Sequence, residues 1–342
     1  MRKTMSFFLI VAVVLISILM IGCSKPKQAT PKEEKYVWRY GNLFADTAKH
    51  PTGQTMLFFI DEFNKRISKD RVEFVIYPSG QLGNSTEAIL GGVLNRTAEL
   101  WDYNAGSYGA YTTAFTPIEC PYIFISPQQA YDLLDGEGGK LMKEKAIKDA
   151  GLHVVFFTDT GFRQLTNSKK PVSSPGDMKG LKIRVMNNPV YIKLMETLGA
   201  LPAPMGFAEL YPALQQGVID GQDNPIVSVA ESKMYEIQKY MTITNHCYGV
   251  STTVMSEEYY QSLPADIRQA LDEAGAIAQK KSREINKEFE DTSLTFLKTQ
   301  LQVIELSEAQ RKVFQAAAQP MWSTVSKLTS QEYFDKIVSY IK

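Results

Sequence analysis

The sequence predicts an α/β fold of two lobes, with parallel sheets flanked by helices and one long helix that reaches both lobes. Strand-like and helix-like apolar patterns alternate along the chain, as they do where helices connect the strands of a sheet. Residues 36–342 are more than one hydrophobic core usually contains, which favours two domains. Residues 265–301 form a charged, apolar-striped segment without proline, longer than the roughly 8 to 20 residues of an ordinary helix.

The first 22 residues are typical of an export signal. Two basic residues precede an apolar run from Phe7 to Ile21, which is shorter than the roughly 20 residues of a membrane-spanning helix. Gly22-Cys23 follows, as at a bacterial lipoprotein cleavage site, so Cys23 is predicted to be the lipidated first residue. The alternative is an uncleaved anchor whose cysteine is incidental. Both interpretations place the folded part outside the cytoplasm.

Residues 23–35 are polar and contain proline, and a segment of this composition acts as a flexible tether.

The net charge of the chain is small. Lys and Arg number 37 and so do Asp and Glu; removal of Arg2 and Lys3 with the signal leaves 35 against 37, a net charge of −2. Such a chain has no basic field for nucleic acid. Any functional cation must therefore lie in a pocket. We expect a monomer.

The predicted elements follow in chain order. The first is a helix whose apolar residues recur at helical spacing, at Met56, Phe59, Ile60, Phe63 and Ile67. A short alternating strand over residues 72–76 ends at a Pro-Ser-Gly turn. Strands over residues 153–157 and 182–186 then lie between helical patterns over residues 127–150 and 189–198. The long helix over residues 265–301 follows, with a possible kink near Gly275.

The sequence lacks the usual enzyme motifs. Its three histidines accompany no HExxH, CxxC, GxSxG, Walker or GxGxxG pattern. Cys120 with a remote histidine is the one nucleophile candidate, but its apolar neighbours favour an inert thiol. Cys120 and Cys247 could pair outside the cytoplasm, or remain single buried thiols. Residues 220–224 have a calcium-like composition but no distal glutamate. We therefore expect no enzyme, no metal and no cofactor.

The stretch from Gly161 to Pro225 resembles the DctP-type solute receptors of TRAP transporters, which are tripartite and independent of ATP. The motifs that carry this resemblance are GFRQ with TNS at 161–168, DMKGLKIRV at 177–185, PMGFAELY at 204–211 and ALQQGVIDGQDNP at 213–225. YPSGQLG at 77–83 is similar to a turn of the family's first lobe, and Asn245-His246 to a pair before its crossover strand. The resemblance covers essentially all of the chain after the tether.

The resemblance implies a periplasmic-binding-protein-like fold. Its first lobe would comprise residues 36–160 and about 250–288, and its second lobe residues 161–249 and about 289–342. The chain departs from the family where Met186 replaces a common proline and Asp223 a usual glutamate. In some members a carboxylate or amide of the first lobe touches the substrate, and the matching segment here is residues 99–104, ELWDYN. The contacts from this lobe, and with them the identity of the substrate, stay open.

The resemblance also implies the ligand contacts. Arg184 would meet the carboxylate of the ligand, since a guanidinium fork matches two carboxylate oxygens. By itself, an arginine after Lys182-Ile183 would be a solvated strand residue. Arg163 is similar to a second cationic contact, or forms a structural ion pair. Asn224 resembles an amide partner for the same carboxylate, although asparagine before proline is also a common turn residue.

Aromatic side chains would complete the pocket. Phe207 resembles a residue that lies against the ligand, and walls from the other lobe are expected at Trp101, Tyr103 and Asn104. Trp101 can equally be core, because aromatic residues dominate core burial. A pocket with few polar anchors and apolar walls is usual for small ligands.

The expected function is capture of a small organic acid, with a lean towards sugar acids, and its delivery to the membrane permease of a TRAP transporter. Closure of the two lobes over the ligand would present a surface to that permease. The alternative is a ligand-sensing receptor for a membrane signalling partner, because the fold alone does not decide between them.

Overall fold

The computed structural model describes residues 34–342. The predicted signal, the predicted lipidation of Cys23 and nearly all of the predicted tether lie outside the described residues. Within residues 34–342, no helix is long and apolar enough to cross a membrane.

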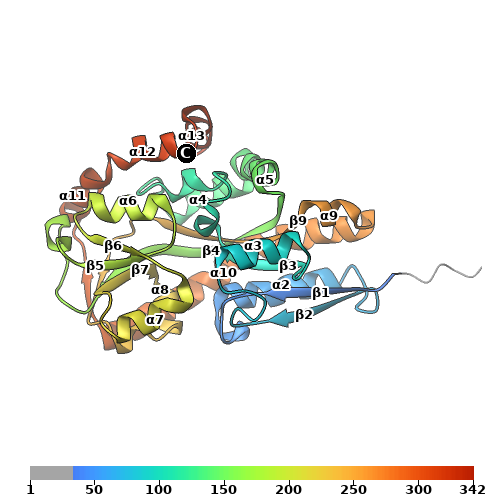
Figure 1. Ribbon diagram of the computed structural model, residues 1–342, viewed down its shortest axis with the longest axis horizontal. Coiled ribbons are helices and arrows are strands. Elements are labelled where there is room, and N and C mark those ends of the chain that lie inside the picture. Colours follow the sequence, from blue (N-terminus) through green and yellow to red (C-terminus); the bar gives the residue numbers. More distant parts are fainter. Residues whose placement is uncertain (1–33) are drawn as a thin grey trace, which may run out of the picture. The chain divides into compact units, whose positions relative to one another are not determined.

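The first sheet has the strand order β2-β1-β3-β9-β4 (Figure 1). Its strands are β1 (Tyr36–Gly41), β2 (Val72–Tyr77), β3 (Leu100–Asn104), β4 (Leu152–Asn167) and β9 (Tyr248–Ser256). β1 runs parallel to β2 and β3, whereas β9 runs antiparallel to β3 and β4. The strand predicted at residues 72–76 is thus confirmed, but the sheet is mixed rather than parallel. Mixing arises because β4 leaves this sheet and β9 returns to it in the opposite direction.

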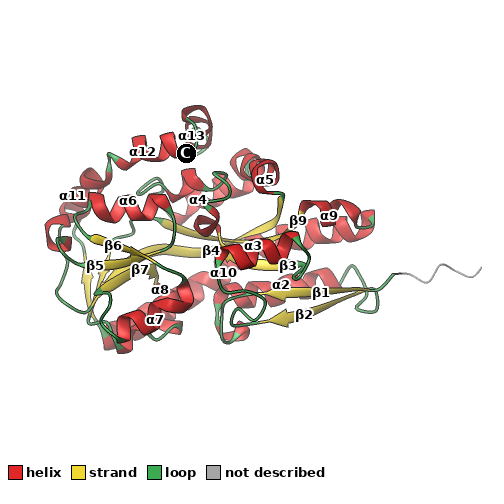
Figure 2. Cartoon of the chain, in the orientation of Figure 1, coloured by secondary structure: helices red, strands yellow, loops and turns green. Residues whose placement is uncertain are grey.

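The second sheet is built on the C-terminal end of β4. It adds β5 (Lys182–Val185), β6 (Leu201–Pro204), β7 (Gly221–Pro225), β8 (Tyr240–Ile243) and β10 (Gln302–Glu305). β5 runs parallel to β6 and β7, while β7 and β8 run antiparallel to β4. The strands form a layer between helices, as Figure 2 shows in yellow and red. This arrangement confirms the predicted α/β class.

β4 joins the two sheets. It pairs with β9 through residues 152–162 and with β7 through residues 163–167. Its register to β9 shifts between Asp159 and Gly161, where Gly161 has a φ of 78°, a left-handed value that glycine adopts without steric cost. The residues that follow this shift, including Arg163, therefore begin the second sheet directly beside the first.

Helices cover both sheets. They are α2 (Pro51–Asn64), α3 (Thr86–Leu94), α4 (Pro127–Asp135), α5 (Glu137–Ala150), α6 (Pro189–Thr197), α7 (Phe207–Gln215), α8 (Ile226–Glu231), α9 (Glu257–Ser262), α10 (Ala265–Gln300), α11 (Glu308–Ala318), α12 (Met321–Leu328) and α13 (Gln331–Val338). Short 3₁₀ helices include η2 (Ala105–Tyr108) and η3 (Thr116–Glu119). The segment predicted as helical over residues 127–150 is divided at Gly136, which adopts an extended conformation.

The fold has two halves, one built on the first sheet and one built on the second sheet. The long helix α10 spans both halves, as predicted. Its N-terminal part enters the core formed by Trp38, Phe59 and other side chains around the first sheet. Leu297 and Leu301, at its C-terminal end, pack with Leu210 near the second sheet. Gly275 lies where α10 approaches β4 closely, because an added Cβ would be 3.1 Å from Val155. The helix is continuous through this glycine.

The C-terminal helices contact residues of both predicted lobes. α12 packs on α6, while Trp322 Nε1 donates to the Pro121 carbonyl at 3.0 Å and the Tyr333 hydroxyl to the Ala114 carbonyl at 2.7 Å. The division of residues between the lobes therefore stays a prediction, with this terminal segment bridging the proposed boundary.

Candidate ligand-binding site

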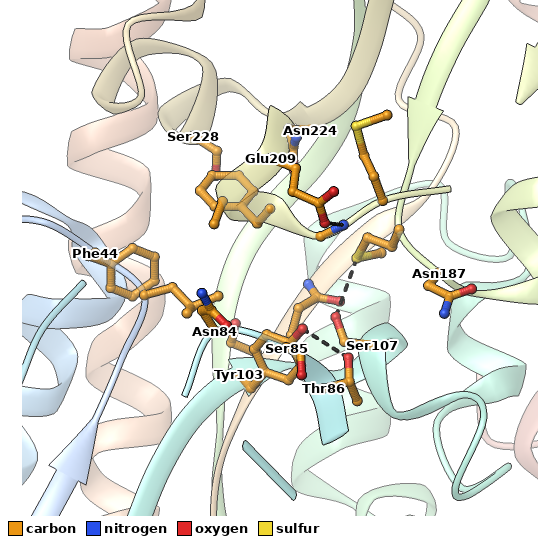
Figure 3. Close-up of a pocket in the computed structure, with 18 of the residues that line it drawn as sticks. Phe44, Asn84, Ser85, Thr86, Tyr103, Ser107, Asn187, Glu209, Asn224 and Ser228 are labelled. Atoms are coloured by element: carbon orange, nitrogen blue, oxygen red, sulfur yellow. Dashed lines mark hydrogen bonds between the residues drawn. The ribbon is translucent and has the colours of Figure 1, made fainter. Parts of the chain in front are cut away.

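A cavity of about 580 Å³ lies between the two sheets (Figure 3). Residues of the first half of the fold that line it include Phe44, Asn84, Ser85, Thr86, Asp102, Tyr103, Asn104 and Ser107. Residues of the second half include Arg163, Arg184, Met186, Asn187, Phe207, Glu209, Asn224 and Ser228. A ligand in this cavity would therefore contact both halves at once.

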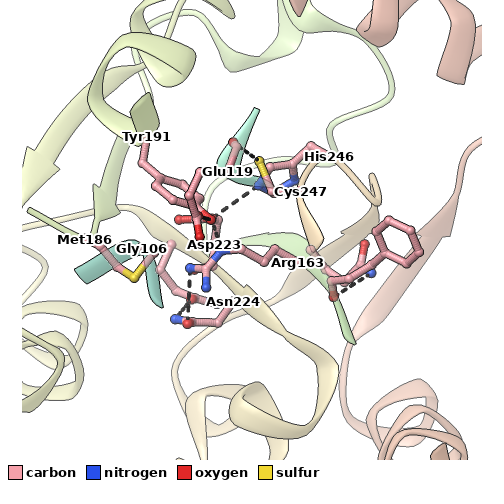
Figure 4. A network of polar contacts seen from close by, with 12 residues as sticks. Gly106, Glu119, Arg163, Met186, Tyr191, Asp223, Asn224, His246 and Cys247 are labelled. Carbon is pink, nitrogen blue, oxygen red and sulfur yellow. Dashed lines mark hydrogen bonds and ion pairs between the residues drawn. The ribbon is translucent and has the colours of Figure 1, made fainter. Parts of the chain in front are cut away.

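Arg163 is buried and forms an ion pair with Asp223. Its Nε donates to Asp223 Oδ2 at 2.7 Å, and its Nη2 donates to the Asp223 carbonyl and, at 3.3 Å, to Asn224 Oδ1 (Figure 4). His246 Nε2 lies 3.2 Å from the same carboxylate oxygen. Burial raises the pKa of Asp223, but Arg163 and His246 lower it more, so the net shift is downward. The charge of Arg163 is thus compensated within the protein.

Arg184 is buried without such compensation. It lies in β5, paired with Ala203 of β6 and Gln222 of β7, and only 2% of its surface is exposed. Its Nε and Nη2 donate to the Met205 carbonyl at 3.1 and 2.7 Å, while its Nη1 is buried and has no partner among the described residues. Burial lowers the pKa of Arg184 to about 10, so it stays protonated at neutral pH.

The other residues predicted from the second lobe also line the cavity. Phe207 is the first residue of α7, and Asn224 lies near the end of β7. Asn224 accepts from Arg163 and donates to Gln222 Oε1. The Asn224 side chain therefore connects the ion pair to the wall of the cavity. The residue lies in a strand and not in a turn.

From the first lobe, the structure brings Tyr103 and Asn104 to the cavity but not Trp101. The Tyr103 hydroxyl lies 3.1 Å from Thr86 Oγ1, and Asn104 Oδ1 accepts from Gly106 N at 3.0 Å, which caps η2. Trp101 is fully buried in the hydrophobic core, so close to Gly41 that an added Cβ there would meet its ring at 2.1 Å. The ligand contact predicted for Trp101 has no support from the geometry.

Metal and thiol chemistry find no site in the part of the chain that the structure describes. No group of three or more His, Cys, Asp or Glu side chains there could hold a metal ion. Cys120 and Cys247 are both free and buried, and burial raises the pKa of each thiol. Neither thiol has the thiolate character that a nucleophile needs.

Comparison with known proteins decides the family. The family of DctP, described as bacterial extracellular solute-binding protein, family 7, matches residues 44–328. The chain belongs to the DctP family. This match confirms the resemblance seen in the motifs. The DctP receptors are substrate-binding proteins of transporters and not an enzyme family.

This DctP-family chain is similar both to a curated relative in sequence and to solved structures in fold. The C4-dicarboxylate-binding periplasmic protein DctP of Rhodobacter capsulatus is 30% identical over 291 residues, which are 84% of each chain. Two solved structures are also similar. The sugar acid binding protein of Advenella mimigardefordensis with galactonate has a TM-score of 0.84 and 27% identity, over 90% of this chain and 98% of that one. A TRAP periplasmic solute binding protein of Roseobacter denitrificans with β-D-glucuronate has a TM-score of 0.82 and 25% identity, over 89% and 98%.

Several residues that line the cavity of this DctP-family chain were not predicted. Asn84, Ser85 and Thr86 open α3, where Ser85 Oγ accepts from Ala88 N at 3.2 Å. Their polar run before an apolar helix is a recognisable N-cap signal, directly after the YPSGQLG turn. Phe44 stacks on His50 with ring centroids 3.6 Å apart, and nothing in the local sequence indicates that pair.

A buried carboxyl group lies behind the ion pair. Glu119 at the end of η3 accepts a hydrogen bond from the Tyr191 hydroxyl of α6, and the Tyr191 ring lies 5.0 Å from the Arg163 guanidinium (Figure 4). Burial raises the pKa of Glu119 to about 7, although Tyr191 and Arg163 lower it. The hydrogen bond from Tyr191 to Glu119 joins segments that follow and precede β4. The protonation of Glu119 therefore affects the stability of the contact between the two halves.

We predict that Arg163→Met lowers the free energy of unfolding by about 3–5 kcal/mol, because it leaves the buried Asp223 carboxylate without its partner. Arg184→Met should cost less than about 1.5 kcal/mol, since it removes hydrogen bonds to one carbonyl and also an uncompensated buried charge. Urea denaturation of the ligand-free proteins measures both values. Equal losses for the two variants would contradict the assignment of Arg163 to structure and Arg184 to ligand.

The raised pKa of Glu119 predicts a pH dependence of stability. Between pH of about 4.5 and about 7 the folded protein retains a proton that the unfolded chain releases, so raising the pH through this window destabilises the folded state. Glu119→Gln removes this titration. The free energy of unfolding of the variant relative to wild type should therefore rise from pH 5 to pH 8, as followed by urea denaturation. A difference that does not change with pH would contradict the prediction.

Proposed function

We propose that this protein is the solute receptor of a TRAP transporter, and that it binds a small polyhydroxylated carboxylate, a sugar acid, whose carboxylate lies on Arg184. The observation that carries the proposal is the buried guanidinium with an unpartnered Nη1 at the cavity. The receptor binds its ligand without converting it and releases it to the permease.

The charges of the site support a single anionic head group. Arg163 is already paired with Asp223, whereas Arg184 forms no ion pair with any described residue. A buried cation without a counter-charge costs free energy, and a bound carboxylate supplies that counter-charge together with a charge-assisted hydrogen bond. Arg163 uses only Nε and Nη2 in its hydrogen bonds to described residues. Its Nη1 can therefore add a second donor to the same head group.

The remainder of the cavity suits a hydroxylated chain. Amide and hydroxyl side chains face it from both halves, at Asn84, Ser85, Thr86, Asn187, Ser228 and Ser251. Such groups donate to and accept from ligand hydroxyls, while the rings of Phe44 and Phe207 offer apolar surface. The similar structures with bound galactonate and glucuronate support a sugar acid, whereas the C4-dicarboxylate-binding relative makes a simple dicarboxylate the alternative to test.

Ligand capture would favour a closed arrangement of the two halves. Asn188 Nδ2 donates to the Gly106 carbonyl at 2.6 Å, and Tyr191 donates to Glu119, so the two halves already touch beside the cavity. A ligand that contacts both halves binds this arrangement in preference to an open one and shifts the population towards it. The closed surface would then be what the permease recognises.

The cellular setting is part of the proposal. We infer that the mature protein begins at a lipidated Cys23 and is held at the outer face of a membrane by that lipid and the tether of residues 23–35. We also infer that it acts as a monomer. Mass spectrometry of the mature N-terminus tests the lipid directly.

We predict that Arg184→Ala weakens binding of the preferred acid by about tenfold to a hundredfold or more, because it removes a charge-assisted bond worth roughly 1.5–3 kcal/mol. Arg184→Lys should also lose affinity, since a point charge cannot reproduce the guanidinium fork. A thermal-shift screen of D-galactonate, D-glucuronate, D-galacturonate, D-erythronate and succinate selects the acid, and calorimetry measures each dissociation constant.

The control for this experiment is Lys182→Ala, which removes an exposed cation from the same strand, outside the cavity. It should bind the acid as wild type does. Wild-type affinity in Arg184→Ala, or no thermal shift with any of these acids, would overturn the proposed function.

A further inference from the structure

Asp102 lies in the wall of the cavity without a complete set of partners. It belongs to β3, opposite Thr253 of β9, and only 3% of its surface is exposed. Its Oδ1 is buried and forms no hydrogen bond with the residues that the structure describes. An unsatisfied buried carboxyl oxygen costs free energy, and a partner that arrives with the ligand would remove this cost.

The surroundings of Asp102 are neutral. The Thr253 hydroxyl hydrogen-bonds to the carboxyl group and in turn to the Tyr40 hydroxyl of β1. The other titratable neighbour is the buried Tyr108 of η2, and among residues 34–342 Asp102 forms no ion pair with lysine, arginine or histidine. Burial therefore raises the pKa of Asp102 well above its usual value, against the smaller effect of Thr253. Burial thus favours the protonated form of this side chain, a neutral carboxylic acid.

We propose that Asp102 is a specificity-determining residue that hydrogen-bonds, as a neutral carboxylic acid, to a hydroxyl group on the carbon chain of the ligand. A protonated carboxyl group offers one O–H donor and acceptor oxygens, which is the complement of an alcohol. This inference rests on the proposed function and adds to it a second contact, on the half of the fold opposite Arg184. Arg184 recognises the charge of the ligand, and Asp102 recognises its hydroxylation.

Selectivity follows from this arrangement. An acid that lacks the hydroxyl would place a methylene group against Asp102 and leave the carboxyl group unsatisfied, and a site built for a hydroxyl rejects analogues without one. A second carboxylate in the same place would be held by no cation. The contact with Asp102 therefore favours hydroxylated monocarboxylates over both simple fatty acids and dicarboxylates.

The test compares Asp102→Ala and Asp102→Asn with wild type by calorimetry. The probe is whichever of D-galactonate, D-glucuronate, D-galacturonate and D-erythronate binds wild type most tightly, and the reference is hexanoate or butyrate, the hydroxyl-free acid of the same chain length. Asp102→Ala should weaken binding of the sugar acid about tenfold or more and leave that of the reference acid within about threefold. Asp102→Asn, which keeps a donor and an acceptor, should stay within about threefold for both.

Infrared difference spectroscopy of the full-length protein provides a measurement that needs no destabilised variant. Addition of the sugar acid should shift the carbonyl band of a protonated carboxyl group, and this shift should be absent in Asp102→Asn. The inference is overturned if Asp102→Ala binds the sugar acid as wild type does, if it loses both acids by the same factor, or if the band does not respond. Arg184→Ala separates the two proposals: if that variant binds normally, the proposed function fails, whereas if only the Asp102 results are negative, the hydroxyl contact alone fails.

Discussion

The ion pair between Arg163 and Asp223 is the interaction on which the site depends. Two buried arginines line one cavity, and their chemistry differs because only one of them has a carboxylate beside it. Asp223 neutralises Arg163 and, with His246, holds it in place. Arg184 is left with a carbonyl oxygen as its only described partner and one nitrogen unsatisfied. A buried guanidinium without an ion-pair partner favours ligands that bring a negative charge.

The fold places this arrangement where a ligand can influence it. β4 crosses from one sheet to the other immediately before Arg163, and the long helix α10 contributes side chains to the cores of both halves. Contacts such as Tyr191 with Glu119 and Asn188 with Gly106 join the halves beside the cavity. We therefore expect binding energy gained in the cavity to favour this arrangement of the two halves.

Prediction from sequence succeeded where local pattern or motif determined the answer. The long helix followed from an uninterrupted apolar stripe, and the DctP family followed from ordered motifs. Four residues named from the same motifs line the cavity, and their contact with a ligand stays a prediction: Arg184, Arg163, Asn224 and Phe207. For Trp101 the sequence left cavity wall and core as alternatives, because strand position cannot distinguish them, and the structure places the ring in the core against Gly41 of another strand. The mixed pairing of β4 and β9, and the role of Asp102 beside Thr253, depend on contacts between segments about 100 residues or more apart, which no local pattern encodes.

A crystal structure of the protein with its bound acid tests the central claim most directly. The ligand carboxylate is expected within about 3.2 Å of Arg184 Nη1, with Arg163 still paired to Asp223. A carboxylate bound away from Arg184, with this guanidinium facing only the Met205 carbonyl, would contradict the claim that an uncompensated buried charge recognises the ligand.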